Sequence, residues 1–224
     1  MGVLDSLWIA EPDIYPIAVR RFVTTPGVQS SHAAKVAQVI GSTHANHPGV
    51  APQSELCVAE VIGGTLTRGW ASMAEALEWL DAEGCQVINM SFACPTSDTA
   101  AEQIMRRLDD RGVILTSSFN AFMHWPHSLP YVIAVGTLHQ RGAMDIQVDG
   151  DAVVTDHCVV EPFRGTSVAS ARMAGMAACA KESDPHIRRE TLLVAVRGYS
   201  SSSSSSTAHG NSRCISTVNN GWAD

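Results

Sequence analysis

The sequence has no long hydrophobic run, few charged residues and no excess of positive charge. No apolar stretch approaches the roughly 20 residues of a membrane-spanning helix, so we expect no contact with a membrane. Lysine and arginine total 15 against 22 aspartate and glutamate residues, which gives a formal net charge of −7. Nucleic-acid binding needs clustered basic residues to neutralise phosphates. Because the basic pairs are scattered along this chain, we expect no nucleic-acid partner.

The first residues also lack the features of a secretory signal peptide. Residues 1–4 run directly into Asp5, without a basic region or a long apolar stretch. We therefore expect a cytoplasmic protein, or a secreted one if a leader has been removed. The six cysteines would permit disulfides, but Cys57, Cys85 and Cys179 fall in or beside apolar segments, as small buried hydrophobes often do. In a reducing compartment we expect free thiols.

What the chain does contain is an alternation of short apolar runs and helical repeats. With 224 residues, 45% of them apolar, it is long enough for one well-filled core. Apolar runs predict strands at residues 2–4, 18–23, 56–62, 87–90, 113–116 and 131–135. Helical spacing predicts helices from residue 32, over 70–80, from a capping box at Thr99 and Glu102 to Gly112, from Ser167, and over 190–196. We predict one α/β domain over residues 1–224, with three layers and a mostly parallel central sheet flanked by helices.

Seven consecutive serines occupy residues 200–206 and have no apolar side chain to bury. We expect a flexible surface loop over residues 200–207. Because fold-like sequence resumes at residues 218–222, the serine tract is expected to lie within the domain.

Three residues far apart in the chain suggest a nucleophilic centre. Asp5 follows a strand candidate, and His32 and Ser167 each lie at the start of a predicted helix. A serine hydroxyl needs a base to take its proton during attack, and histidine can be that base when a buried carboxylate fixes its tautomer. Asn120 follows another strand candidate, and its amide can donate a hydrogen bond to a developing oxyanion. The order Asp, His, Ser disfavours an α/β-hydrolase, in which the serine comes first.

Six short segments carry these residues or lie between them, in one order along the chain. They are Val-Leu-Asp-Ser at residues 3–6, His-Ala-Ala-Lys-Val-Ala at 32–37, Gly-Val-Ala-Pro at 49–52, Val-Ile-Asn-Met-Ser at 87–91, Val-Ile-Ala-Val-Gly at 132–136 and Gly-Thr-Ser-Val-Ala-Ser at 165–170. Together they resemble the motifs of subtilisin-like serine peptidases, the subtilases. The resemblance implies a serine endopeptidase with Asp5, His32 and Ser167 as catalytic triad and Asn120 as oxyanion donor.

The resemblance also implies a substrate-binding edge and its partners. That edge comprises Ser91, Phe92, Ala93, Cys94, Ser118 and Phe119. The expected partner is a peptide or protein substrate, no cofactor is implied, and the oligomeric state stays open. The loop over residues 42–48 is too short and too poor in carboxylates for the calcium site of the family. The pairs His44/His47 and His124/His127 are interpreted as loop histidines, so we expect no metal.

Several positions depart from the family motifs. Leu7 stands where the aspartate motif usually has glycine, and Phe119 replaces a glycine along the pocket for the P1 side chain, which precedes the scissile bond. Ala93 and Cys94 replace two glycines on the facing wall. Because glycine lets a ligand approach the backbone closely, we expect a narrowed pocket with a small or unusual P1 preference.

Three functions of different classes are compatible with this pattern. The first is an endopeptidase of restricted specificity, resembling minimal subtilases that process precursor peptides of natural products. The second is a macrocyclase, a transpeptidase that needs a device to exclude water, although no lid insertion is visible. The third is a pseudo-peptidase that binds peptides along residues 91–93 by strand addition. The presence of all four chemical residues favours the first.

Overall fold

Seven strands form one sheet at the centre of the protein. The computed structural model describes residues 1–23, 31–63 and 73–202. The strand order is β2-β3-β1-β4-β5-β6-β7, and each neighbouring pair is parallel. The strands are β1 (Gly2–Asp5), β2 (Ala18–Arg21), β3 (Cys57–Glu60), β4 (Val87–Met90), β5 (Ile114–Ser118), β6 (Ile133–Thr137) and β7 (Ile146–Val148). The predicted α/β fold with a mostly parallel sheet is confirmed.

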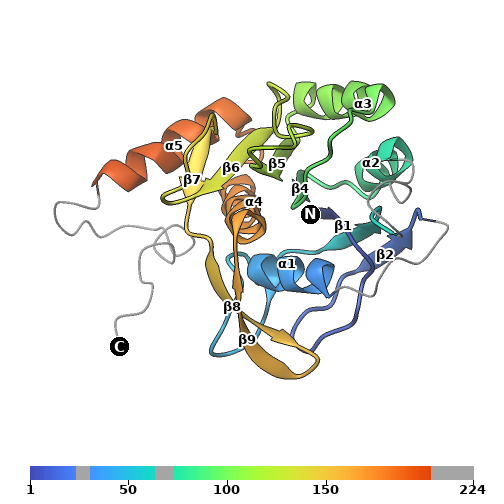
Figure 1. The fold of residues 1–224 in the computed structure, drawn as a ribbon, viewed down its shortest axis with the longest axis vertical. Helices are drawn as coiled ribbons and strands as arrows, with labels where there is room; N and C mark the ends of the chain where they lie inside the picture. The colour runs from blue at the N-terminus through green and yellow to red at the C-terminus, as the bar shows by residue number, and fades with distance from the viewer. Residues whose placement is uncertain (24–30, 64–72, 203–224) are drawn as a thin grey trace.

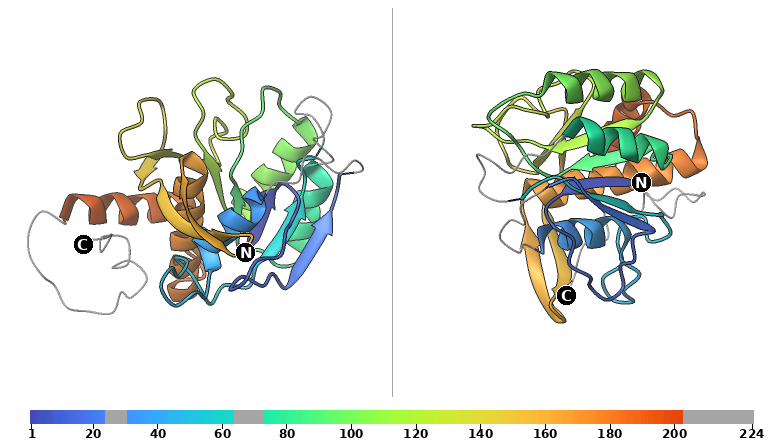
Figure 2. Two further views of the ribbon diagram at one scale, coloured as in Figure 1. Left: turned by 60° about the horizontal axis from the view of Figure 1, so that its bottom comes forward. Right: turned by 90° about the vertical axis from the view of Figure 1, so that its right-hand side faces the viewer.

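Helices cover both faces of the sheet (Figures 1 and 2). On one face lie α1 (His32–Gly41), α4 (Thr166–Ser183) and α5 (Arg189–Ser202), and on the other lie α2 (Met73–Ala82) and α3 (Thr99–Asp110). Adjacent strand residues point to opposite faces, so Val3 packs in the core with α1 and α4, whereas Leu4 packs with α2 and α3. Both faces of the sheet are therefore buried beneath helices, as is usual for a parallel sheet.

Small residues let α4 run through the interior of the molecule. Most of its first fifteen residues are alanine, glycine or serine, and eleven of its residues are buried. A Cβ atom at Gly175 would lie 2.7 Å from Cβ of Val50, so only glycine fits where this helix meets the segment after α1. This close packing sets the position of the first turn of α4, which carries Ser167.

A two-stranded hairpin leaves the sheet and lies across α1 (Figure 1). It consists of β8 (Asp151–Asp156) and β9 (Val159–Arg164), which pair antiparallel. The side chain of Gln38 on α1 donates to the Thr155 carbonyl and accepts from the Thr155 N–H, both at 2.7 Å. The hairpin was not predicted from the sequence, and neither was β7.

Two details of the secondary structure differ from expectation. The N-cap of α3 is Asp98 and not Thr99, because the Asp98 carboxylate accepts from the backbone N–H groups of Ala100 and Ala101. The helix α5 extends to Ser202, so the first three residues of the expected serine loop are helical. The remainder of the predicted loop over residues 200–207 lies outside the described residues, as does Trp70 of the predicted helix over 70–80.

Five cysteines fall within the described residues, and all have free thiols. Burial raises the pKa of the Cys85 and Cys94 thiols to about 12, so these side chains behave as small hydrophobes. None of the described helices combines the length and the apolar character that crossing a bilayer requires.

Candidate active site

The structure brings Asp5, His32 and Ser167 together at the carboxyl edge of the sheet. Asp5 is the last residue of β1, His32 is the first of α1, and Ser167 lies in the first turn of α4. His32 Nδ1 lies 2.8 Å from Oδ1 of Asp5, and His32 Nε2 lies 3.1 Å from Oγ of Ser167. These contacts span 27 and 135 residues of sequence. Hydrogen bonds thus run from a buried carboxylate through an imidazole to a hydroxyl, the arrangement that removes a proton from serine.

The environment of His32 suits a base. Asp5 is completely buried, and its Oδ1 also accepts the Ser6 N–H at 2.6 Å, which holds the carboxylate in place. The negative charge of Asp5 raises the pKa of His32, while burial and the nearby charge of Lys35 lower it. Because Asp5 has the largest effect, the pKa of His32 lies above its ordinary value of 6.5.

The Ser167 hydroxyl has a second acceptor besides His32. Its Oγ lies 3.2 Å from the carbonyl oxygen of Ser91, and the Ser91 hydroxyl donates in turn to the Ser167 carbonyl at 3.1 Å. Gly165, the N-cap of α4, has a φ of +124°, which L side chains rarely adopt. The turn before the nucleophile therefore requires glycine for its backbone conformation.

Asn120 follows β5, as predicted, and its amide orientation is determined by the backbone. Its Oδ1 accepts from the N–H groups of Phe122 at 2.9 Å and Met123 at 3.0 Å. Nδ2 is consequently the side of the amide that can donate to a substrate. The half-buried side chain lies at the same edge of the sheet as Ser167.

The predicted substrate-binding edge is mostly buried. Ser91, Phe92 and Cys94 are 4%, 8% and 3% exposed, and Ala93 is half-buried. On the facing wall Ser118 is 4% exposed. Contact between substrate and this edge would therefore involve mainly backbone groups.

A pocket of about 400 Å³ lies beside this wall, between the segment after β5 and the β6–β7 connection. Phe119 lines it, and its ring lies 5.1 Å from that of His127. A Cβ atom at Gly142 would lie 2.3 Å from Cζ of Phe119, so the aromatic ring packs directly against glycine. Desolvation lowers the pKa of His127, and the charge of neighbouring His124 adds to this effect.

Sequence reasoning missed two residues that join the hairpin to α1, Phe163 on β9 and Lys35 on α1. The Phe163 ring packs edge-on against His32, with centroids 5.6 Å apart. Lys35 bridges Asp156 and Glu161, with Nζ–O distances of 2.8 Å and 2.6 Å. The apolar residues of β9, Val159, Val160 and Phe163, do not alternate with polar ones, and only the tertiary fold places the hairpin over α1.

The histidine pairs His44/His47 and His124/His127 make contacts within their own loops. His44 Nδ1 accepts from the backbone N–H groups of Asn46 and His47, both at 3.2 Å, and the rings of His44 and His47 stack. The rings of His124 and His127 lie farther apart, with centroids separated by 6.2 Å.

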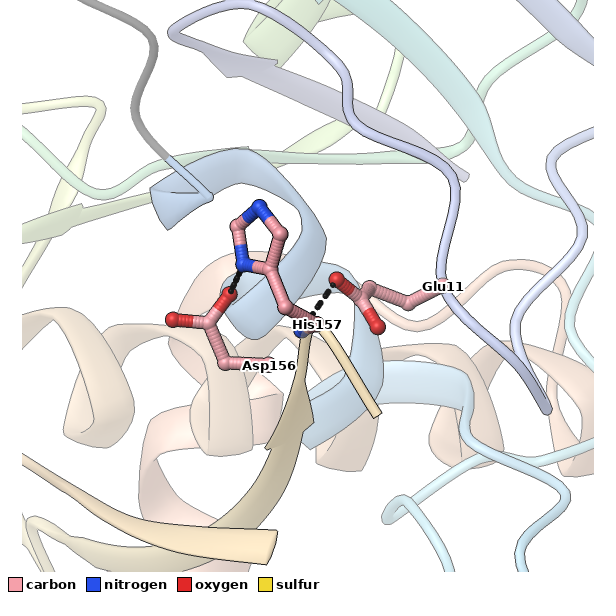
Figure 3. A group of neighbouring side chains, drawn as sticks. All are labelled: Glu11, Asp156 and His157. Atoms are coloured by element: carbon pink, nitrogen blue, oxygen red, sulfur yellow. Dashed lines mark hydrogen bonds and ion pairs between the residues drawn. The ribbon is translucent and has the colours of Figure 1, made fainter. Parts of the chain in front are cut away.

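One group of potential metal ligands comprises Glu11, Asp156 and His157, whose ligand atoms lie within 4.8 Å of one another (Figure 3). His157 Nδ1 contacts Asp156 Oδ1, and Glu11 Oε1 accepts the His157 backbone N–H, each at 2.8 Å. Lys35 bonds the other oxygen of Asp156. Each of the three residues is thus already bonded within the protein. We interpret the group as a set of contacts that fixes the tip of the hairpin.

The sequence comparisons identify the family of this chain. A model of the subtilase family matches residues 25–155, more than half of the chain. The chain belongs to the subtilase family. Among its relatives, M-protease from Shouchella clausii (strain KSM-K16) is 27% identical over 208 residues, covering 83% of this chain and 54% of that protein. Subtilisin Savinase from Lederbergia lenta is also 27% identical over 208 residues, covering 83% and 77%. This subtilase thus spans about half the length of M-protease.

Two solved protease structures share the fold. The prenylagaramide maturation protease PagA superposes with a TM-score of 0.65 at 22% identity, covering 88% of this chain and 80% of that chain. A mutant of the protease domain of PatA superposes with a TM-score of 0.65 at 20% identity, covering 89% and 85%.

Proposed function

We propose that this subtilase is a serine endopeptidase that hydrolyses peptide bonds through an acyl-enzyme intermediate. The observation that carries the proposal is the set of contacts from Asp5 through His32 to Ser167, at 2.8 Å and 3.1 Å. Family membership supports it independently. Ser167 is the nucleophile, His32 the general base and then acid, and Asp5 the residue that orients and stabilises the imidazolium.

The chemistry follows from these positions. Oγ of Ser167 bonds to the carbonyl carbon of the substrate while its proton passes to Nε2 of His32. The carbonyl oxygen becomes an oxyanion, which Nδ2 of Asn120 and the backbone N–H of Ser167 stabilise. When the C–N bond breaks, His32 returns the proton to the leaving amine. Water then attacks the ester by the same route and releases the carboxylic acid and the free Ser167.

The proposed substrate is a restricted set of peptides, such as a precursor peptide cut at a defined site. Phe119, Ala93 and Cys94 support this restriction, because they occupy positions where the family has glycine. One fold neighbour, PagA, is named as a maturation protease. A peptide library tests the restriction, with cleavage after small or unusual P1 residues expected. Efficient cleavage after large aromatic residues would overturn it.

Fluorophosphonate labelling tests the activity itself. The wild type is expected to react, and Ser167→Ala is expected to lose all labelling. Ser183→Ala is the matched control, because it removes a hydroxyl from the other end of the same helix. Absence of labelling in folded wild type would contradict the proposal and favour the peptide-binding alternative.

Mass spectrometry of the products separates hydrolysis from transpeptidation. Hydrolysis adds the mass of water across the cleaved bond, whereas macrocyclisation releases a cyclic product without it. We expect linear products, and a cyclic product would identify the macrocyclase instead.

A further inference from the structure

A buried polar cluster lies directly behind the nucleophile. Asn89 on β4, Thr116 on β5 and Ser170 on α4 are completely buried, and Ser91 is 4% exposed. Asn89 shares its side of the strand with Val87, which faces α4. Because burying an amide is costly unless its polar atoms are paired, its contacts show what the cluster does.

In the structure the amide of Asn89 has a definite orientation. Oδ1 accepts the hydroxyl of Thr116 at 3.1 Å and that of Ser170 at 2.8 Å. Nδ2 is therefore directed at Ser91 and donates to its Oγ at 2.8 Å. If the amide turned over, Nδ2 would donate to these two hydroxyls and Oδ1 would accept the Ser91 proton, which would then not be available to the Ser167 carbonyl.

The direction of that bond determines the next one. Because Nδ2 of Asn89 can only donate, Oγ of Ser91 accepts this hydrogen bond with a lone pair. The proton of Ser91 is then free for the carbonyl of Ser167, to which it donates at 3.1 Å. A relay of two hydrogen bonds thus connects Asn89 to the backbone of the nucleophile.

This relay affects which acceptor receives the hydrogen bond of the Ser167 hydroxyl. The single proton of the Ser167 hydroxyl has two acceptors at similar distances, His32 Nε2 at 3.1 Å and the Ser91 carbonyl at 3.2 Å. Only donation to His32 leads to proton transfer. A shift of a few tenths of an ångström between Ser91 and Ser167 changes which acceptor is favoured, because hydrogen bonds weaken steeply with poor geometry.

We propose that Asn89 is a positioning residue for the reaction, which holds Ser167 in register with His32 through the Ser91 hydroxyl. The inference rests on the proposed function, since it concerns the reactivity of the same serine. Asn89 itself touches neither substrate nor the reacting atoms.

The test measures the rate constant of fluorophosphonate inactivation and the affinity for the probe separately, for variants at both ends of the relay. Asn89→Ala and Ser91→Ala are each expected to slow inactivation about 10-fold, the effect of one buried hydrogen bond, with unchanged affinity. Asn89→Asp is expected to be as slow, because a carboxylate accepts the Ser91 proton and reverses the relay. The double variant Asn89→Ala/Ser91→Ala is expected to be no slower than the slower single variant.

Ile88→Val is the control for stability, because Ile88 lies on the same strand but packs on the other face with α2 and α3. It is expected to lower the melting temperature without changing the inactivation rate. Wild-type rates for folded Asn89→Ala and Asn89→Asp would overturn the proposal, as would independent, multiplying losses in the double variant. If Asn89→Ala does not fold, Asn89→Asp and Ser91→Ala carry the test. An unreactive wild type would instead overturn the proposed function, and this inference with it.

Discussion

Replacing Asn120 with aspartate separates its structural contacts from its proposed catalytic one. In the structure Oδ1 accepts two backbone N–H groups, from Phe122 and Met123, at 2.9 Å and 3.0 Å. A carboxylate retains both bonds, so Asn120→Asp is expected to leave the stability of the loop nearly unchanged. What it loses is the Nδ2 donor, and it adds negative charge beside the developing oxyanion.

The expected loss is large and falls on turnover. Removal of one oxyanion donor costs about 100- to 1,000-fold in kcat, a range known from an asparagine donor in a subtilisin. Ground-state binding of a peptide does not depend on the oxyanion, so KM is expected to change little. Asn120→Ala is the paired variant, because it removes the two loop bonds as well. It is expected to show the same kinetic loss together with a stability loss of about 1 kcal/mol.

Steady-state kinetics on one cleaved peptide and thermal unfolding measure these effects. A folded Asn120→Asp variant with kcat within about 5-fold of the wild type would refute the reasoning. An unchanged rate in Asn120→Asp combined with a slow Asn120→Ala would assign the residue to loop structure alone.

The remaining predictions concern the base and two glycines. His32 acts as a base when deprotonated, so activity rises with pH through its pKa; Asp5→Asn removes the main cause of the raised pKa and is expected to move the acid limb to lower pH. Lys35 lowers the same pKa, so Lys35→Met is expected to move the acid limb to higher pH. Gly49→Ala is expected to destabilise by about 3 kcal/mol, because its Cβ would lie 2.5 Å from a backbone nitrogen. Gly84→Ala, with open space but a φ of +73°, is expected to cost only about 1 kcal/mol.

Each of these has a clear contrary result. The reasoning about the pKa of His32 is refuted if the acid limbs of Asp5→Asn and Lys35→Met move in the same direction. Lys35→Arg is the control that keeps the charge. Denaturant unfolding fails it if Gly84→Ala is the more destabilised glycine variant.

The sequence predicted the regular elements best where burial is complete. The run Val87–Met90 is a strand at the predicted residues, because three of its four side chains are apolar and all four are buried, as suits a strand with both faces covered. The N-cap of α3 was predicted one residue too late, because Asp98 and Thr99 can both cap a helix. In the structure Asp98 has the extended backbone that the N-cap position needs. The hairpin of β8 and β9 was missed because only one of its twelve side chains, Val154, is buried, which leaves little apolar pattern.

The candidate site also contains residues that the sequence predicted and residues that it did not. The motifs around Asp5, His32 and Ser167 predicted that the three would meet, and the structure places them within hydrogen-bond distance. The positions of Phe163 and Lys35 could not be predicted, because their contacts depend on how the hairpin lies across α1.

The sequence by itself determined which residue types could do chemistry and in which order they occur, since those are properties of the chain. Only the tertiary structure decided which way the amides of Asn89 and Asn120 point and which acceptors share the Ser167 proton. Such choices depend on differences of tenths of an ångström between groups as far apart in sequence as Asn89 and Ser170. Distances of that kind arise from packing of the sheet against α4 and leave no pattern in the sequence.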